Sequence, residues 1–412
     1  MGNESLFNEA KNWLVGGVNS PIRASIRPFP FFTDHAKGAY LWDSEGNRYC
    51  DYCLAYGPLV LGHADPDVVS SVSAQLERGT TYGTPTGLEV EFAKKVCELA
   101  PNVEMIRAVN SGTEATMAAL RLARSITGRD DIAALDGGYH GSHDSVLAKK
   151  DGKSVIASSS GVTGGHVGGT RMVGYNDPGA LSDALGDEGV AAFIMEPVMG
   201  NVGCVTPKNG YLADVRKICD ETGTLLIFDE TITGFRLSLG GAQEYYGVDA
   251  DIVTYGKIAG GGLPIGIIGS SRENMENFAP LGKVYNAGTF SGNPLSMAAG
   301  LAALIKISSG KALKVAHSNH NMLVKGIEDI LPEGSSLISA PGMFQVYLGR
   351  ENVYNAIDAR NADPKRFMDF WKKMFTRGFF LPPSNFESNF VSSCHDKEIV
   401  DGTLDAMGDA LQ

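Results

Sequence analysis

The chain has 412 residues, of which 43% are hydrophobic and 20% are charged, and its formal net charge is −12. This length allows about two or three domains with a sizeable shared core. The acidic balance argues against nucleic acid and against an anionic membrane surface as partners. No apolar run is long enough to span a bilayer, and the N-terminus lacks a signal core and an Arg-rich transit character, so we expect a cytoplasmic protein.

The six cysteines indicate free thiols in a reducing compartment, because a disulfide scaffold is shorter and denser in cysteine. Cys50 and Cys53 form a C-x-x-C. The segment around them is typical of a buried strand, and no second C-x-x-C follows. A structural role for this pair is therefore favoured over a metal or redox role, and we predict no metal site.

The first predicted elements are a short helix at 4–14 and strands within 38–53, joined by a turn at Ser44–Asn47. From residue 66 onward, amphipathic helices alternate with short apolar strands. The predicted helices are 66–78, 87–99, 113–127 and 209–222, and the predicted strands are Met105–Val109, Ile132–Leu135, Ala191–Met195, Leu225–Phe228 and Asp251–Thr254. This alternation predicts an α/β fold with a mostly parallel sheet between helices.

A polar, Gly/Ser-rich stretch at 158–170 interrupts this order and predicts a long mobile loop. After a helix at about 294–308, the pattern becomes α+β and continues to the C-terminus. We therefore predict an N-terminal segment at 1–57, a large domain at 58–300 and a small C-terminal domain at 301–412.

The strongest local signal is the pair formed by Asp229, which ends the strand Leu225–Phe228, and Lys257, which follows the next strand. In α/β sheets, residues at these strand ends face the crevice that binds ligands. Taken singly, each residue is more often a turn-capping acid or a surface lysine. Together they suit pyridoxal phosphate, which needs an amine for a Schiff base and a carboxylate that keeps its ring nitrogen charged. The lysine amine can also act as a general acid and base.

A second signal lies where the strand Met105–Val109 meets the following helix. The turn there contains Ser111, Gly112 and Thr113. Such a turn at a helix N-terminus offers N–H groups, two hydroxyls and a favourable dipole to a phosphate. The alternative is that Ser111 or Thr113 only caps the helix.

Three segments resemble those of the class-III aminotransferases, which are pyridoxal-phosphate enzymes of fold type I. They are Asn110–Ala115, Asp229–Arg236 and Gly256–Pro264. Within that class, four further segments resemble the glutamate-1-semialdehyde aminomutases: Gly16–Arg23, Gly57–His63, Gly138–Gly141 and Gly288–Pro294. The resemblance runs from about residue 5 to the C-terminus, with most gaps near 150–175 and 310–340. It implies that the smaller α+β domain is built from the two chain ends.

The resemblance also implies roles for individual residues. Lys257 carries the cofactor and is catalytic, Asp229 pairs with the ring nitrogen, and Tyr139 stacks on the ring. Thr289 reaches the cofactor phosphate of a neighbouring subunit, so the protein is expected to be a homodimer. The implied cofactor-binding set is Ser111, Gly112, Thr113, Tyr139, His140, Asp229, Thr231, Lys257 and Thr289, and the implied substrate-binding set is Ser20, Arg23, Tyr56, Asn201 and Glu387.

Several of these residues have a purely structural alternative. Tyr139 could pack in the core, Arg23 could form a surface charge pair, and Glu230 could pair with Arg236. His140 and His143 form an H-x-x-H, but the cofactor motif explains that segment better than a metal does.

The chain also departs from the family at three places. Tyr56 stands where Trp is usual, and Thr231 stands where Val is usual, which adds a hydroxyl beside the cofactor ring. The segment 150–172 resembles the family's mobile lid but is shorter than in bacterial members.

The number of arginines that bind substrate carboxylates distinguishes a transaminase from an aminomutase. A transaminase that uses a dicarboxylic acceptor often has a second arginine, but 378–395 contains none and has Glu387 instead. An aminomutase needs one clamp, which Arg23 suits, because donor and acceptor are the same molecule. The resemblance thus implies conversion of glutamate-1-semialdehyde, (S)-4-amino-5-oxopentanoate, to 5-aminolevulinate for tetrapyrrole synthesis, with pyridoxal or pyridoxamine phosphate as cofactor. A glutamyl-tRNA reductase is the implied supplier of the substrate.

Two other functions compete with this interpretation. One is a class-III transaminase that acts on a β- or ω-amino acid with a 2-oxo acid acceptor. The other is a non-catalytic cofactor-binding sensor, which is disfavoured by the pair of Lys257 and Asp229 and by the absence of a basic arm.

Overall fold

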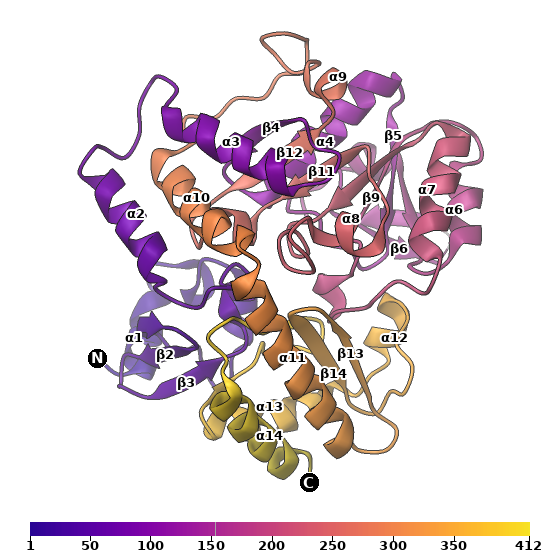
Figure 1. Cartoon of the computed structure of the whole chain (residues 1–412). Helices are drawn as coiled ribbons and strands as arrows, with labels where there is room; N and C mark the ends of the chain where they lie inside the picture. The colour runs from indigo at the N-terminus through magenta and orange to yellow at the C-terminus, as the bar shows by residue number, and fades with distance from the viewer. Residues whose placement is uncertain (153) are drawn as a thin grey trace.

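The computed structural model describes residues 1–152 and 154–412; Lys153, in the predicted lid 150–172, lies outside the described residues. A seven-stranded sheet forms the centre of the molecule, in the order β4-β12-β11-β10-β9-β5-β8 (Figure 1). Its strands are β4 Met105–Val109, β5 Asp131–Leu135, β8 Thr170–Val173, β9 Val190–Met195, β10 Leu225–Asp229, β11 Ile252–Tyr255 and β12 Gly266–Ser270.

The sheet is mostly parallel, as predicted, and only β12 runs antiparallel to its neighbours β4 and β11. All six residues of β9 are buried, because helices cover both faces of the sheet. Successive side chains of a strand point to opposite faces. Accordingly, Phe193 and Met195 belong to one core cluster, and Ala192 and Ile194 to another.

One face of the sheet is covered mainly by α4, whose alanine-rich side packs on Ile194, Ile227 and Ile268. The other face is covered by a larger group of helices that shares one core cluster with the strands. The helices of this large part of the molecule are α2 Pro66–Leu76, α3 Gly87–Leu99, α4 Gly112–Thr127, α6 Pro178–Leu185, α7 Tyr211–Thr222, α8 Gly241–Tyr246, α9 Arg272–Met275 and α10 Pro294–Ser308.

The two ends of the chain lie side by side in the lower part of Figure 1. The strands β1 Thr33–Lys37, β2 Tyr40–Asp43 and β3 Arg48–Asp51 form a sheet whose fourth strand, β15 Phe379–Phe380, comes from the C-terminal part and runs parallel to β3. A shared core cluster contains Tyr52 from the first part and Trp371 and Met407 from the last. The domain limits at 57 and 300 remain predictions.

The remaining elements of the chain ends are a three-stranded sheet and five helices. The sheet contains β13 Ser336–Ala340, β14 Met343–Tyr347 and β16 Asn389–Phe390. The helices are α1 Asn3–Ala10, α11 Lys311–Ile330, α12 Ala356–Arg360, α13 Pro364–Thr376 and α14 Lys397–Leu411. Short 3₁₀ turns are η1 Val15–Gly17, η2 Pro21–Ser25, η3 Leu54–Tyr56, η4 Gly200–Val202 and η5 Lys257–Gly260.

The polar stretch predicted as one long loop is more ordered than expected. A hairpin of β6 Ala148–Asp151 and β7 Ser154–Ala157 precedes it, a helical turn α5 Gly164–Val167 lies within it, and β8 begins at its last residue. The prediction of a continuous loop at 158–170 is therefore wrong. β8 forms hydrogen bonds with β5, and the weakly apolar sequence of β8 did not predict this pairing. The mobility of this segment remains a prediction.

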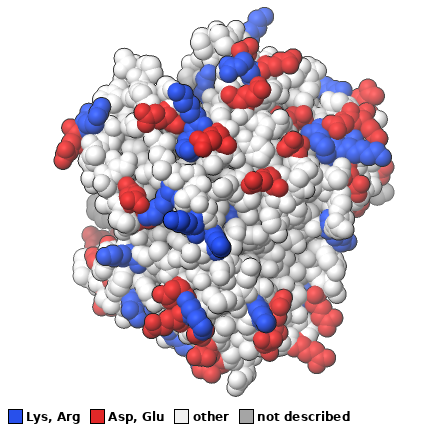
Figure 2. All heavy atoms as spheres, viewed as in Figure 1, with Lys and Arg blue, Asp and Glu red and all other residues white. Residues whose placement is uncertain are grey.

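Other expectations about the chain concern cysteines, membranes and charge. Cys50 and Cys53 are free and buried, in and just after β3, and burial raises the pKa of both thiols, as a structural role requires. In the described residues, no helix has the length and apolar character needed to cross a bilayer, and no three His, Cys, Asp or Glu side chains are grouped to hold a metal. Figure 2 shows that acidic and basic side chains are interspersed on the face in view.

Candidate active site

A cavity of about 650 Å³ lies beyond the carboxyl ends of β10 and β11, where α/β sheets bind ligands. Segments far apart in the sequence meet there: the start of η2, the end of η3, the N-terminus of α4, the loops after β5 and β9, and the C-terminal loop before β16. Of the predicted site residues, those that line the cavity are Ser20, Tyr56, Gly112, Thr113, Tyr139, His140, Asn201, Asp229, Thr231, Lys257 and Glu387.

Three predicted residues lie outside this cavity. Ser111 caps α4, because its Oγ accepts a hydrogen bond of 3.2 Å from the Glu114 N–H. Arg23 is exposed and lines an adjoining cavity of about 430 Å³, whose wall also includes Tyr56. Thr289 is exposed in a separate surface hollow with 81–86. The single chain therefore does not bring Arg23 or Thr289 to Lys257.

Asp229, at the end of β10, is a buried and firmly held carboxylate. Its Oδ2 lies 2.9 Å from His140 Nδ1, and its Oδ1 accepts from the Thr231 hydroxyl at 2.6 Å and the Thr254 hydroxyl at 3.0 Å. Burial by itself would raise the pKa of Asp229, but these hydrogen bonds and the charge of His140 hold that pKa below its usual value. Asp229 is thus a fixed anion at neutral pH, suited to face a positive ring nitrogen.

Lys257 begins η5 and is partly exposed to the cavity. Its φ of 44° lies in the left-handed region, which is strained for a residue with a side chain. Gly256 precedes it and leaves room for the Thr231 side chain. Desolvation by the surrounding protein, followed by the positive charge of Arg236, lowers the pKa of the Lys257 amine to about 8. A considerable fraction of this amine is therefore uncharged and nucleophilic near neutral pH.

This shift predicts the reactivity of the cofactor-free protein toward acetic anhydride. We expect half-maximal acetylation of Lys257 near pH 8, measured residue by residue with mass spectrometry. The control is Lys283, which is exposed in this chain and does not line the cavity. Parallel acetylation curves for Lys257 and Lys283 would contradict the lowered pKa.

Two acids besides Asp229 share the cavity with Lys257. Burial raises the pKa of Glu387 to about 7, so this group can hold a proton near neutral pH. Glu196, just after β9, is buried, and burial raises its pKa. Its oxygens accept from the Tyr139 N–H at 3.0 Å, the Gly200 N–H at 2.9 Å and Asn201 Nδ2 at 2.9 Å. Glu196 was not predicted, although, like Asp229, it comes at the end of a buried strand.

Two structural alternatives from the sequence are wrong: packing of Tyr139 in the core, and pairing of Glu230 with Arg236. The Tyr139 side chain is 54% exposed, so it does not pack in the core. Glu230 and Arg236 form no ion pair: Glu230 accepts from the Ala242 N–H at the start of α8, and Arg236 Nε donates to the Ile232 carbonyl at 2.9 Å. Backbone groups thus bind both side chains, although Arg236 Nη1 is buried without a hydrogen-bond partner in the described residues. Arg236 also lies over the Phe390 ring, and burial lowers the pKa of Arg236 to about 9.

The N-terminus of α4 depends on close contact with β12. A Cβ at Gly266 would lie 2.0 Å from the Ser111 carbonyl oxygen, so no larger residue fits without moving the turn that presents Gly112 and Thr113. We expect Gly266→Ala to lower the free energy of unfolding by about 1–3 kcal/mol and to weaken phosphate binding. Thermal unfolding and fluorescence titration with pyridoxamine phosphate measure the two effects.

Gly87→Ala is the matched control for this substitution, because open space surrounds a Cβ at the first residue of α3. Equal melting temperatures for both variants would show that the contact between β12 and the α4 turn is not needed.

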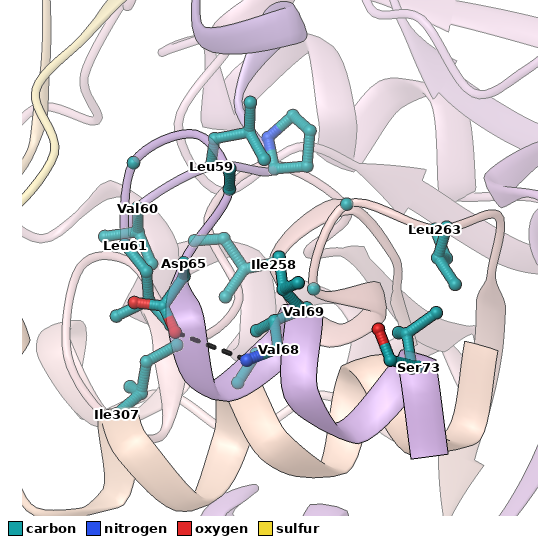
Figure 3. Close-up of a pocket in the computed structure, with 17 residues that line it drawn as sticks. Leu59, Val60, Leu61, Asp65, Val68, Val69, Ser73, Ile258, Leu263 and Ile307 are labelled. Carbon is teal, nitrogen blue, oxygen red and sulfur yellow. Dashed lines mark hydrogen bonds between the residues drawn. The ribbon is translucent and has the colours of Figure 1, made fainter. Parts of the chain in front are cut away.

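An apolar cavity of about 330 Å³ lies next to η5, between α2 and α10 (Figure 3). Side chains such as Leu59, Ile258 and Ile307 surround it. Asp65 is its one ionisable side chain, but Asp65 caps α2 through the Val68 N–H at 3.4 Å and pairs with Lys306. This second cavity therefore offers no group for acid–base chemistry.

The larger cavity fits pyridoxal phosphate part by part. The Lys257 amine suits a Schiff base with the cofactor aldehyde, and the Asp229 carboxylate suits an ion pair with the charged ring nitrogen. The α4 N-terminus, with Gly112 and Thr113, presents N–H groups and a hydroxyl for the phosphate. His140 Nε2 is buried without a hydrogen-bond partner in the described residues, which leaves a polar atom available to a bound group.

Comparison with known proteins agrees with this geometry. Residues 22–354 match the sequence profile of the class-III aminotransferases. The chain belongs to this family. A glutamate-1-semialdehyde 2,1-aminomutase of Methanothrix thermoacetophila is 51% identical over 98% of this chain and 94% of its own length. The same-named protein of Methanobrevibacter smithii is 49% identical over 100% of this chain and 98% of its own length.

Solved structures of a transaminase and an aminomutase share the whole fold. An omega-transaminase from Sphaerobacter thermophilus has a TM-score of 0.92 at 30% identity and covers 100% of this chain and 97% of its own. A glutamate-1-semialdehyde-aminomutase from Pseudomonas aeruginosa has a TM-score of 0.90 at 26% identity, covering 99% and 94%. A variant of that enzyme was solved in complex with PMP, with a TM-score of 0.91 at 25% identity over the same shares. The predicted family, fold type and pyridoxal-phosphate cofactor are confirmed.

Proposed function

We propose that this class-III enzyme is a glutamate-1-semialdehyde 2,1-aminomutase that forms 5-aminolevulinate for tetrapyrrole synthesis. The observation that carries the proposal is the similarity of the whole chain, at 51% and 49% identity, to two proteins of that name. The solved structures do not by themselves select the reaction, because a transaminase and an aminomutase both superpose on the entire chain.

The cavity residues have separate roles in such a reaction. Bound pyridoxal phosphate supplies an electron sink that stabilises negative charge on the substrate carbon. Asp229 keeps the ring nitrogen positive, and the α4 N-terminus with Thr113 holds the phosphate. The Lys257 amine, with a pKa near 8, takes up and returns protons at the reacting carbons. The exposed ring of Tyr139 covers one face of the site.

The charges in the cavity favour transfer within one molecule. No arginine is among the residues that line it, and the C-terminal loop contributes Glu387 instead. A dicarboxylic amino acceptor would therefore find no arginine in the cavity wall for its second carboxylate. We assign Arg23 to the single carboxylate of the substrate, because Ser20, Pro21 and Ile22, directly before it, already line the cavity.

The test is a turnover experiment on protein loaded with pyridoxamine phosphate. Glutamate-1-semialdehyde is added with no other amino donor or acceptor, and 5-aminolevulinate is quantified. Sustained product over many turnovers supports the aminomutase. A single turnover that only a 2-oxo acid and an amino donor can restart would overturn it in favour of a transaminase for a β- or ω-amino acid.

We also propose that the working unit is a homodimer in which Thr289 reaches the partner's cofactor phosphate. The support is a group of exposed apolar side chains on α2, α3 and α10, which pack together, on the loop before α3 and on the loop that carries Thr289. They are Val69, Leu76, Tyr82, Val90, Leu281, Tyr285, Phe290 and Ile305. Burying such a surface in a partner interface is favourable.

Hybrid dimers test this arrangement. Lys257→Ala and Thr289→Ala proteins are each expected to be weakly active, but a mixed dimer contains one site with both Lys257 and Thr289 intact. Co-expression should restore about half of the wild-type activity per hybrid dimer. Strictly additive activity of the two variants would exclude the shared site.

The proposed setting is the cytoplasm, where six free thiols are stable, with a glutamyl-tRNA reductase as supplier of the aldehyde.

A further inference from the structure

The two oxygens of the Asp229 carboxylate have unequal surroundings. Oδ1 faces three donors: the Thr231 hydroxyl at 2.6 Å, the Thr231 N–H at 3.2 Å and the Thr254 hydroxyl at 3.0 Å. Oδ2 has one, His140 Nδ1 at 2.9 Å. A carboxylate has about four lone-pair sites in all. Oδ1 is therefore saturated, and Oδ2 keeps a free site.

Two glycines flank the Thr231 side chain. A Cβ at Gly112 would lie 3.3 Å from Thr231 Oγ1, and a Cβ at Gly256 would lie 3.2 Å from its Cγ2. The threonine thus lies between the α4 N-terminus and the residue that precedes Lys257, and a larger residue at either glycine would crowd it.

Thr254 completes the arrangement from the neighbouring strand. It is fully buried on β11, and its Cα is paired in register with that of Asp229. Its hydroxyl points across the ladder to the same oxygen that Thr231 occupies. Two hydroxyls from different segments therefore converge on Oδ1.

We propose that Thr231 is a positioning residue whose hydroxyl, with that of Thr254, saturates Oδ1 of Asp229 and so presents Oδ2 alone to the cationic ring nitrogen of the cofactor. This inference rests on the proposed function as a pyridoxal-phosphate enzyme. It gives a role to the position at which this chain has Thr and the family usually has Val, since Val offers no donor.

The consequence is a more firmly held proton on the ring nitrogen. Donors to a carboxylate stabilise its charged form, so Asp229 remains the anion and the ring keeps the proton. A positive ring in turn disfavours protonation elsewhere on the same conjugated system. The other titratable groups around Asp229 are His140, Glu196, Glu230, Tyr139 and Lys257, and none of the variants below replaces them.

Thr231→Val tests the role with almost no change in volume, and Thr231→Ser restores the hydroxyl. In the Val variant, we expect the pH midpoint of the holoenzyme's visible absorbance to rise by about one unit. We expect kcat to fall about tenfold with KM within about twofold of wild type. The Ser variant should stay within about 0.3 unit and about threefold of wild type.

Thr254→Val removes the second hydroxyl and should move the midpoint in the same direction, so it serves if the Thr231 variant folds poorly. Wild-type titration curves for both Val variants would overturn the inference. A wild-type protein that gains no visible absorbance with pyridoxal phosphate would instead overturn the proposed function. Fluorescence titration with pyridoxamine phosphate separates the two cases, because it measures cofactor binding without turnover.

Discussion

Lys257→Ala is expected to lower kcat by on the order of 10⁴-fold. The variant loses the one amine in the cavity, and with it the group that both attaches the cofactor and moves protons at the reacting carbons. The noncovalent contacts survive, because the N-terminus of α4 and Asp229 do not depend on the lysine. We therefore expect pyridoxamine phosphate to bind to the variant, while the visible absorbance of the lysine-attached cofactor disappears.

Product formation from glutamate-1-semialdehyde and equilibrium binding of pyridoxamine phosphate measure the two effects separately. Lys217→Ala is the control, since Lys217 is exposed on α7 and does not line the cavity. Turnover by Lys257→Ala within about tenfold of wild type would show that the Lys257 amine is not needed for catalysis. Loss of binding in parallel with loss of turnover would point to a structural defect, which the melting temperature of the variant would reveal.

Asp229→Asn should lower kcat by about 10³-fold while the protein remains folded. The amide can keep its oxygen toward the hydroxyls of Thr231 and Thr254 and turn its nitrogen to His140, whose other tautomer accepts a hydrogen bond. The fold therefore tolerates the change. The ring nitrogen of the cofactor loses its only fixed counter-charge, and the electron sink weakens.

Steady-state kinetics and thermal unfolding together check this prediction. Asp249→Asn, at an exposed position before β11, is the control for removal of one carboxylate. A melting temperature close to wild type with a large loss of kcat is the expected pattern. An active Asp229→Asn protein would show that the charge of this carboxylate does not support the chemistry.

Periodic segments were the most predictable part of the fold. The helix predicted at 87–99 is α3 with the same limits, and the apolar runs became β4, β5, β9, β10 and β11. β12 was missed because glycine at both its first and fourth positions hides its strand character. In contrast, the helix predicted at 4–14 is too long, because the observed helix α1 ends at Ala10.

The candidate site was predictable where the chain itself carries a motif. Asp229, Lys257 and the α4 turn were found because each follows a strand, and strand ends of one sheet meet. Glu196 and Thr254 were missed, since their roles depend on which atoms they bond across the sheet, and spacing does not encode this. The positions of Arg23 and Thr289 outside the cavity likewise depend on tertiary packing, not on local pattern.

The pairing of β3 with β15 has a consequence for biosynthesis. Residues 48–51 leave the ribosome long before their parallel partner at 379–380 is made. Until then, β3 is an open edge beside buried aromatic side chains such as Tyr52, and such edges invite pairing with other chains. Non-local pairings of this kind also form slowly. The nascent chain therefore depends on 379–380 to cover the edge of β3, and a product terminated before these residues is expected to aggregate rather than fold.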